Sequence, residues 1–149
     1  MPRIVRVAQT AWEGSLSRGS GTVSATSSGA FALPFSLPSR IGDPGGKTSP
    51  EELLAAAHAG CFTTSLAGEL GTAGTLPERL EVRCTITMDE VEGKGHQIVL
   101  SEIEATGVVP GADEASFAAA VTAADAGCSF SALIRASAEV RVSGRLETT

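Results

Sequence analysis

The stretch Ser49-Pro-Glu-Glu-Leu-Leu-Ala-Ala-Ala-His-Ala-Gly-Cys61 carries the strongest structural signal in this chain. Ser49 is a typical helix N-cap, Pro50 suits the first helical position, and Glu52 stands where it would close a capping box. These features predict a long helix that runs to about Leu70. Because its faces consist largely of small residues, we expect the helix to be enclosed on several sides, with Cys61 in a crevice.

The sequence on either side of this helix alternates between apolar and polar residues, as half-buried strands do. Before the helix we expect a three-stranded β-meander, followed by an exposed loop from Ser39 to Ser49 that carries Arg40. After the helix we expect a β-hairpin, a second helix and a final strand. The expected segments are 4–7, 22–24 and 31–33 for the meander, 82–88 and 98–109 for the hairpin, 115–126 for the second helix and 138–146 for the last strand. This order predicts an α+β fold that forms a single domain over residues 1–149.

Composition excludes several classes of function. The chain has 149 residues, a formal net charge of −6 and 4 % aromatic residues, which argues against nucleic acid and anionic membranes as partners. The N-terminal residues lack an apolar signal segment, and no apolar stretch reaches the length of a membrane span, so we expect a cytoplasmic protein. In a reducing compartment, three cysteines predict free thiols rather than a disulfide scaffold.

The segment Gly42-Asp-Pro-Gly-Gly-Lys-Thr48 is similar to a phosphate-binding loop that precedes a helix. Its spacing is wrong, because the first glycine of such a loop would fall at Ile41. We interpret the segment as a glycine-rich turn before a capped helix.

Cys61 is the first candidate for chemistry. A thiol buried among apolar groups has a raised pKa and is inert, so a reactive Cys61 needs a nearby cation. The sequence offers Arg40 in the preceding loop and His58 three residues earlier on the helix. An arginine could hold a thiolate and also meet a carboxylate, and Glu51 is the free carboxylate if Glu52 closes the capping box.

Glu51 and Cys61 lie ten residues apart on one predicted helix, which is about 15 Å along its axis. They cannot share a site within one chain. If both belong to one catalytic group, a two-fold dimer would bring Glu51 of one subunit towards Cys61 of the other.

Cys128 follows Gly127 and is expected at the start of a short helical turn. If the fold brings it to Cys61, the natural chemistry is oxidation of one thiol by a peroxide to a sulfenic acid, followed by a disulfide. Cys84 occupies an inward position of a predicted strand, where we expect it to serve packing.

The chain resembles the OsmC/Ohr family of thiol peroxidases, and closely its OsmC branch, over nearly its whole length. The segments that carry the resemblance are 11–14, 21–24, Arg40, 49–53, 56–62 and 126–128 with Ser131. The resemblance implies an intertwined α+β homodimer in which Cys61 is peroxidatic, Cys128 is resolving, and Arg40 and Glu51 activate the thiolate and orient the hydroperoxide.

The same resemblance implies the partners of the reaction. The expected substrates are organic hydroperoxides, with hydrogen peroxide reduced more weakly, in oxidative or osmotic stress defence. The expected reductant is a dithiol such as a lipoylated protein, and the family uses no metal, haem or flavin. Ser129 departs from the family pattern, which commonly has proline after the resolving cysteine; serine would loosen this segment and alter the rate of disulfide closure.

Three alternatives remain open from the residues. A cysteine hydrolase could use Cys61 with His58, although no Asp or Asn is placed to orient the imidazole. A zinc site could draw on His58, Cys61 and Cys128, although the spacing of paired ligands is missing. A non-catalytic redox switch could use the same thiol pair, and sustained turnover would distinguish the enzyme from it.

Overall fold

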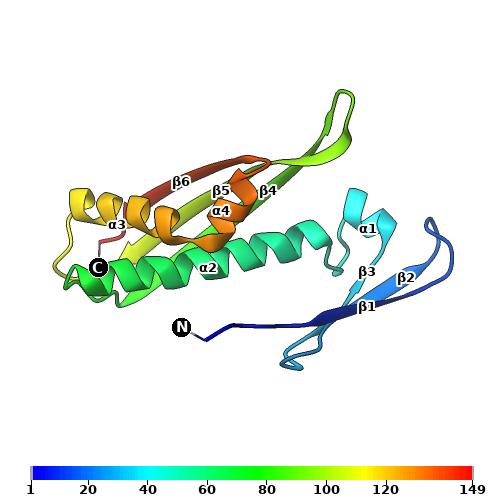
Figure 1. Ribbon diagram of the computed structural model, residues 1–149, viewed down its shortest axis with the longest axis horizontal. Helices are drawn as coiled ribbons and strands as arrows, with labels where there is room; N and C mark the ends of the chain where they lie inside the picture. Colours follow the sequence, from blue (N-terminus) through cyan, green and yellow to red (C-terminus); the bar gives the residue numbers. More distant parts are fainter. Residues whose placement is uncertain (1, 149) are drawn as a thin grey trace. The chain divides into compact units, whose positions relative to one another are not determined.

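The computed structural model describes residues 2–148 and consists of two compact units, one ending at Leu53 and the other beginning at Leu54. Strands and helices follow the predicted order, which confirms the α+β fold (Figure 1). The elements are β1 (Ala8–Glu13), β2 (Ser20–Ala25), β3 (Ala32–Phe35), α1 (Leu37–Ile41), α2 (Pro50–Thr72), β4 (Arg79–Val91), β5 (Gly95–Val108), α3 (Glu114–Gly127), α4 (Ser129–Arg135) and β6 (Glu139–Leu146).

The first unit contains the antiparallel meander, in the order β1-β2-β3. Its first strand begins at Ala8, so the predicted strand at 4–7 was wrong. The partner strand β2 ends at Ala25, which pairs with Ala8, and the chain before Ala8 therefore extends past the end of its neighbour. Val7 is held instead by its N–H, which donates to the Ser27 hydroxyl at 2.6 Å. Alternation alone could not show where the partner strand ends.

Helix α1 was not predicted and occupies the start of the expected loop. Ser36 caps it, because the Ser36 hydroxyl accepts a hydrogen bond from the Ser39 N–H at 3.3 Å and lies 2.7 Å from the Ser39 hydroxyl. Arg40 therefore lies in the last turn of a capped helix rather than in an open loop. A helix of five residues gives too short a pattern for periodicity to show.

Helix α2 runs two residues beyond the predicted Leu70. Its buried stripe consists of the larger side chains, which recur every fourth position: His58, Phe62, Leu66 and Leu70. Cys61 lies beside this stripe and is half-buried. The bulky apolar residues thus decide which face of α2 is buried, and the small residues form its flanks.

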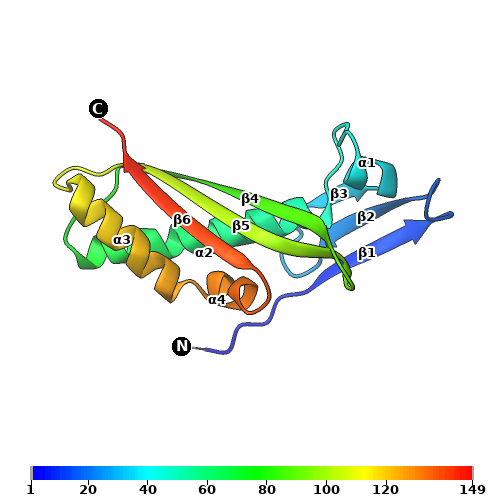
Figure 2. The same cartoon turned by 90° about the horizontal axis from the view of Figure 1, so that it is seen from above.

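The second unit contains the sheet β4-β5-β6, in which β4 and β5 form the predicted antiparallel hairpin and β6 runs parallel to β5. Helices α3 and α4 make the connection between the parallel strands (Figure 2). Side chains of α2, β5 and α3 form one hydrophobic core, whose buried members include Phe62, Leu66, Leu70, Ile103, Ala105, Phe117, Val121, Ala124 and Cys128.

The sheet comes close to α3 at two glycines. A Cβ on Gly144 would lie 2.6 Å from a methyl carbon of Val121 and 3.0 Å from the Phe117 ring, and a Cβ on Gly107 would lie 3.1 Å from the same ring. These positions therefore require glycine so that Phe117 can pack directly on the backbone of β5 and β6.

Within residues 2–148, no single helix is both long and apolar enough to cross a membrane. Helices α3 and α4 reach that length and composition only as a pair, which is bent by 67°.

Candidate active site

The start of α2 differs in one detail from the predicted capping box. The Ser49 hydroxyl accepts a hydrogen bond from the Glu52 N–H at 3.1 Å, as expected of an N-cap. The Glu52 carboxylate, however, accepts a hydrogen bond from the Thr48 hydroxyl at 2.8 Å, so the box does not close in the predicted way. Glu52 is engaged locally in either case, which leaves Glu51 free for another partner.

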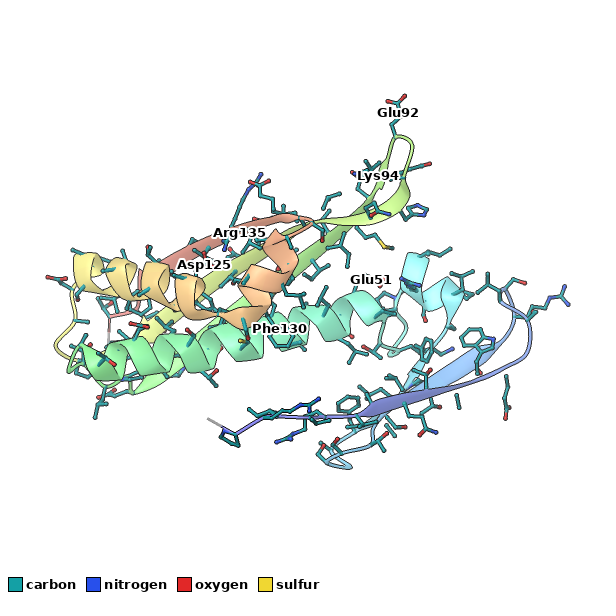
Figure 3. The ribbon with its side chains drawn as sticks, viewed as in Figure 1. Glu51, Glu92, Lys94, Asp125, Phe130 and Arg135 are labelled. Atoms are coloured by element: carbon teal, nitrogen blue, oxygen red, sulfur yellow. The ribbon has the colours of Figure 1, made fainter. Side chains whose placement is uncertain are left out.

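That partner is Arg40. The Arg40 Nε donates to both carboxylate oxygens of Glu51, at 2.6 and 3.1 Å. Both residues belong to the first unit, and Glu51 lies at the start of α2 (Figure 3). The two terminal nitrogens of the guanidinium have no hydrogen-bond partner among the residues that the structure describes. The ion pair therefore fixes the orientation of Arg40 and leaves donors for a further anionic or polar group.

An apolar pocket in the first unit includes Arg40 in its wall. The other lining residues are Trp12, Leu16, Phe35, Ser36, Leu37 and Pro50. The Trp12 and Phe35 rings pack at 5.5 Å between centroids, with 49° between their planes. The pocket thus combines an aromatic wall with a cation, a lining that suits a small ligand with an apolar tail and a polar head.

Cys128 lies at the junction of α3 and α4, where it ends one helix and caps the next. Its sulfur accepts a hydrogen bond from the Ser131 N–H at 3.5 Å, and its side chain is 1 % exposed. An ion pair of 2.7 Å between Asp125 and Arg135 spans the same junction (Figure 3). The predicted short helical turn after Gly127 is α4.

The structure brings Cys61 and Cys128 together. Cys61 on α2 packs against the hydrophobic core that contains Cys128, and its sulfur lies 3.8 Å from the hydroxyl of Ser129, the residue after Cys128. Burial raises the pKa of Cys61, but hydrogen bonds from the Phe130 N–H, the Cys128 thiol, and the hydroxyl and N–H of Ser129 together hold that pKa below the usual value for a thiol. Both sulfurs are free thiols in the structure. A half-buried thiol of lowered pKa beside a fully buried one is a site for cysteine redox chemistry.

The second candidate partner of Cys61, His58, has both ring nitrogens engaged elsewhere. Nδ1 lies 2.6 Å from the Ser101 hydroxyl and Nε2 lies 2.8 Å from the Ser131 hydroxyl. All three side chains are fully buried, and desolvation lowers the pKa of His58. An imidazole held by two serines is a structural link between α2, β5 and α4, and the geometry gives no support to a Cys61 and His58 hydrolase.

Cys84 lies beside this histidine, on β4. Its sulfur is 3.3 Å from the Ser101 hydroxyl and 3.8 Å from His58 Nδ1. Burial raises the pKa of the Cys84 thiol more than the Ser101 hydrogen bond lowers it. Such a thiol is a poor nucleophile at neutral pH, in keeping with the packing role predicted for it.

Among the residues that the structure describes, neither the glycine-rich loop nor the candidate zinc ligands form a binding site. In the glycine-rich loop, the Gly45 N–H donates to the Asp43 carboxylate and the Lys47 N–H donates to the Pro44 carbonyl, so these donors are already used within the loop. Across residues 2–148, no three His, Cys, Asp or Glu side chains gather so that they could hold a metal ion.

Sequence reasoning missed the groups that touch the Cys61 sulfur from α4. Ser129 and Phe130 belong to the first turn after Cys128, and the Ser129 hydroxyl lies 3.8 Å from the Cys61 sulfur. The break Gly127-Cys128 between two helical runs indicated where this turn begins, but no pattern could show that it faces Cys61.

Comparison with known proteins places this chain in a family. The OsmC-like protein family model matches residues 42–143. Peroxiredoxin OsmC of Escherichia coli strain K12 is 36 % identical over 129 residues, which cover 86 % of this chain and 88 % of that protein. The chain belongs to the OsmC family. It is therefore a thiol peroxidase with a peroxiredoxin-type redox function.

Solved structures show the same fold. An organic hydroperoxide resistance protein OsmC from Legionella pneumophila superposes with a TM-score of 0.76 at 22 % identity, covering 97 % of this chain and 98 % of that one. A putative organic hydroperoxide resistance protein from Vibrio cholerae gives a TM-score of 0.72 at 27 % identity, covering 97 % and 94 %. The predicted OsmC-like fold is confirmed, whereas the intertwined homodimer and the single domain stay predictions.

Proposed function

We propose that this thiol peroxidase reduces organic hydroperoxides, with Cys61 as the attacking thiol and Cys128 as the resolving thiol. The observation that carries the proposal is the position of the Cys61 sulfur at the first turn of α4, 3.8 Å from the hydroxyl of the residue that follows Cys128. There, hydrogen bonds hold the pKa of Cys61 below its usual value while Cys128 is within reach. Cys84 has neither property, because its pKa is raised by burial.

The chemistry follows from these two thiols. The Cys61 thiolate attacks the terminal oxygen of the hydroperoxide, an S–O bond forms, and the O–O bond breaks. The alkoxide leaves with the electron pair and takes a proton from solvent, which gives an alcohol and a Cys61 sulfenic acid. Sulfur is oxidised by two electrons and the peroxide is reduced by two. The Cys128 thiol then attacks the sulfenic sulfur, a disulfide forms, and hydroxide leaves with the proton of that thiol as water.

We assign Arg40 and Glu51 to the binding and activation of the hydroperoxide. Their ion pair fixes the guanidinium through Nε, and the remaining nitrogens are free to donate to a peroxide oxygen or a thiolate. Glu51 and Cys61 are ten positions apart on α2, which corresponds to about 15 Å of helix. A homodimer in which the Arg40 and Glu51 pair of one subunit meets Cys61 of its partner satisfies this spacing.

The preference for an organic substrate rests on the pocket that contains Arg40. Its aromatic and aliphatic lining would hold an alkyl or aryl group while the hydroperoxide end meets the guanidinium. Hydrogen peroxide gains nothing from such a lining and is expected to react more slowly.

The cycle requires an external reductant. An accessible dithiol, such as a lipoylated protein, would open the Cys61–Cys128 disulfide by exchange and would itself become a disulfide. A cytoplasmic location fits three free thiols, since a reducing compartment keeps them reduced.

Mass spectrometry after one equivalent of an alkyl hydroperoxide tests the proposal most directly. We expect a Cys61–Cys128 crosslink in the wild type, and in Cys128→Ser a Cys61 sulfenic acid without a crosslink. Cys61→Ser should consume no peroxide, and Cys84→Ala serves as the matched cysteine control that keeps activity.

Steady-state assays with a dithiol complete the test. Continuous consumption of the alkyl hydroperoxide, faster than that of hydrogen peroxide, supports the proposal. A single equivalent consumed in the presence of excess dithiol would identify a redox switch instead, and full activity of Cys61→Ser would refute the assignment of the attacking thiol.

A further inference from the structure

Ser129 has no chemical step assigned to it above, yet its hydroxyl lies beside the sulfur of Cys61. Its side chain is exposed, and its hydroxyl oxygen lies 3.8 Å from Cys61 Sγ. The two residues come from different elements, α2 and the first position of α4. The contact is therefore made by the fold and does not follow from neighbouring positions in the chain.

Once Cys61 ionises, the hydrogen bond between Ser129 and Cys61 can have only one direction. A thiolate has no proton to donate, so Ser129 must be the donor and the sulfur the acceptor. Hydrogen bonds to the charged form of a group favour that form. The hydroxyl thus increases the fraction of Cys61 that is ready to attack.

We propose that Ser129 is a catalytic residue of this peroxidase, which donates its hydroxyl hydrogen bond to the Cys61 thiolate in the resting enzyme. The inference rests on the proposed role of Cys61 as the attacking thiol. When the S–O bond forms, the sulfur loses its negative charge and the hydrogen bond weakens. Ser129 therefore acts by setting the population of thiolate before attack.

The backbone of Ser129 supports the same role. The N–H groups of Ser129 and Phe130 also help to lower the pKa of Cys61, so Ser129 acts on this thiol through its main chain as well as its side chain. Alanine at this position would remove the hydroxyl and keep the N–H. Proline would remove both donors, and the first position of a helix accommodates its fixed φ. These two substitutions separate the two contributions without breaking α4.

A hydrogen bond donated to a thiolate increases the fraction of thiol that is ionised, but it lowers the nucleophilicity of the thiolate. The first effect acts below the thiol pKa, and the second follows because a thiolate of lower pKa is intrinsically a weaker nucleophile. The hydroxyl should therefore accelerate the reaction at mildly acidic pH and have little effect, or a slightly slowing one, at high pH. A change that merely disordered the site would lower the rate at every pH.

The experiment is the pH profile of Cys61 alkylation by iodoacetamide, with the modified residue identified by peptide mapping. For Ser129→Ala we expect the midpoint to move to higher pH and the rate at pH 6 to fall about threefold to tenfold, the range of one hydrogen bond. The rate at high pH should stay within about twofold of the wild type. Ser129→Pro should move the midpoint further, and Ser129→Thr, which keeps a hydroxyl, should restore the wild-type profile.

The matched control is Ser137→Ala, at an exposed serine that follows α4. Its profile should overlay the wild type. A Ser129→Ala profile that also overlays the wild type, or one that falls equally at all pH values, would overturn the role of Ser129.

Failure of the proposed attack by Cys61 would give a different result from failure of the Ser129 proposal. Because mapping follows Cys61 itself, the alkylation profile decides the Ser129 contact whether or not peroxide is turned over. Peroxide oxidation found at another cysteine would refute the proposed attack by Cys61, and the catalytic role of Ser129 would fall with it. With Cys61 as the oxidised residue, single-turnover reduction of an alkyl hydroperoxide at pH 6 should slow in Ser129→Ala by the same factor as alkylation.

Discussion

Replacement of His58 by leucine should destabilise the second unit, because it removes two buried hydrogen bonds and leaves one buried hydroxyl without its partner. His58 is fully buried, and its two nitrogens hold Ser101 at 2.6 Å and Ser131 at 2.8 Å. Leucine fills much of the same space but offers no donor or acceptor. Ser101 would keep the contact of its hydroxyl with the Cys84 sulfur at 3.3 Å, whereas the Ser131 hydroxyl would lose its histidine partner in a fully buried position.

The magnitude follows from these contacts. Two lost hydrogen bonds contribute about 1 kcal/mol each, and a buried hydroxyl without a partner costs about 1–3 kcal/mol. Additional burial of apolar leucine surface offsets part of this sum. We expect the free energy of unfolding of His58→Leu to fall by about 3 kcal/mol, which corresponds to a decrease in Tm of about 6–12 °C for a chain of this size.

Urea unfolding at one fixed protein concentration measures this difference, since dimer formation would make stability depend on concentration. The double variant His58→Leu with Ser131→Ala removes the unpartnered hydroxyl, and we expect it to regain about 1–2 kcal/mol over His58→Leu. If the double variant is no more stable than the single one, the loss does not come from the Ser131 hydroxyl. A His58→Leu protein as stable as the wild type would refute the reasoning altogether.

Four further outcomes follow from the structure. Because desolvation lowers the pKa of His58, the unfolded chain binds a proton that the native chain does not; urea titrations should show stability falling as pH drops below about 6.5, a slope that His58→Leu should lack. Arg40→Ala should slow peroxide reduction by about tenfold or more in a stopped-flow assay, since a cation near a thiolate favours the charged form; Lys47→Ala, in the neighbouring loop, is the control, and an unchanged rate would remove Arg40 from the site. Gly144→Ala should lower the free energy of unfolding by about 1–3 kcal/mol, because its Cβ would meet Val121 at 2.6 Å, whereas Gly60→Ala, with open space around its Cβ, should be neutral or stabilising; equal effects of the two would contradict the close packing at Gly144. Asp125→Ala should lower the Tm by a few degrees, as it removes the ion pair with Arg135 across the junction of α3 and α4, and a Tm equal to that of the wild type would show that this pair does not brace the junction.

The long-range order of this fold could be predicted because its elements carry strong local patterns. The capped start of α2 and the alternation in β4, β5 and β6 depend on neighbouring residues, and the structure confirms them. Helix α1 was missed because five residues give too short a pattern, and the other error falls where the outcome depends on a distant partner. The run Ile4–Val7 has the composition of a strand, but β2 ends before it can pair with that run.

The sequence predicted which residues form the candidate site, but it did not predict how they are arranged in space. The sequence predicted Cys61, Cys128, Arg40 and Glu51 as site residues, and the structure forms an ion pair between the last two. The proximity of Cys61 and Cys128 could not be predicted from spacing, because the two residues lie on different elements that pack in one hydrophobic core. The donors of Ser129 and Phe130 are main-chain and hydroxyl groups, which no spacing rule distinguishes from those of any other helical turn.

The exposure of the two sulfurs also determines how the proposed cycle is ordered. Cys61 is half-buried and Cys128 is 1 % exposed, so a peroxide in solution meets Cys61 first. For the reduction step, the low pKa of Cys61 would make it the better leaving group and would favour attack on the Cys128 sulfur. An external dithiol cannot reach the buried Cys128 sulfur unless the junction of α3 and α4 opens. Accessibility therefore decides the site of attack, and leaving-group ability does not. Because the Asp125–Arg135 pair and the contact of Ser131 with His58 both hold that junction, the accessible Cys61 is assigned both reactions with external molecules, and Cys128 reacts only within the chain.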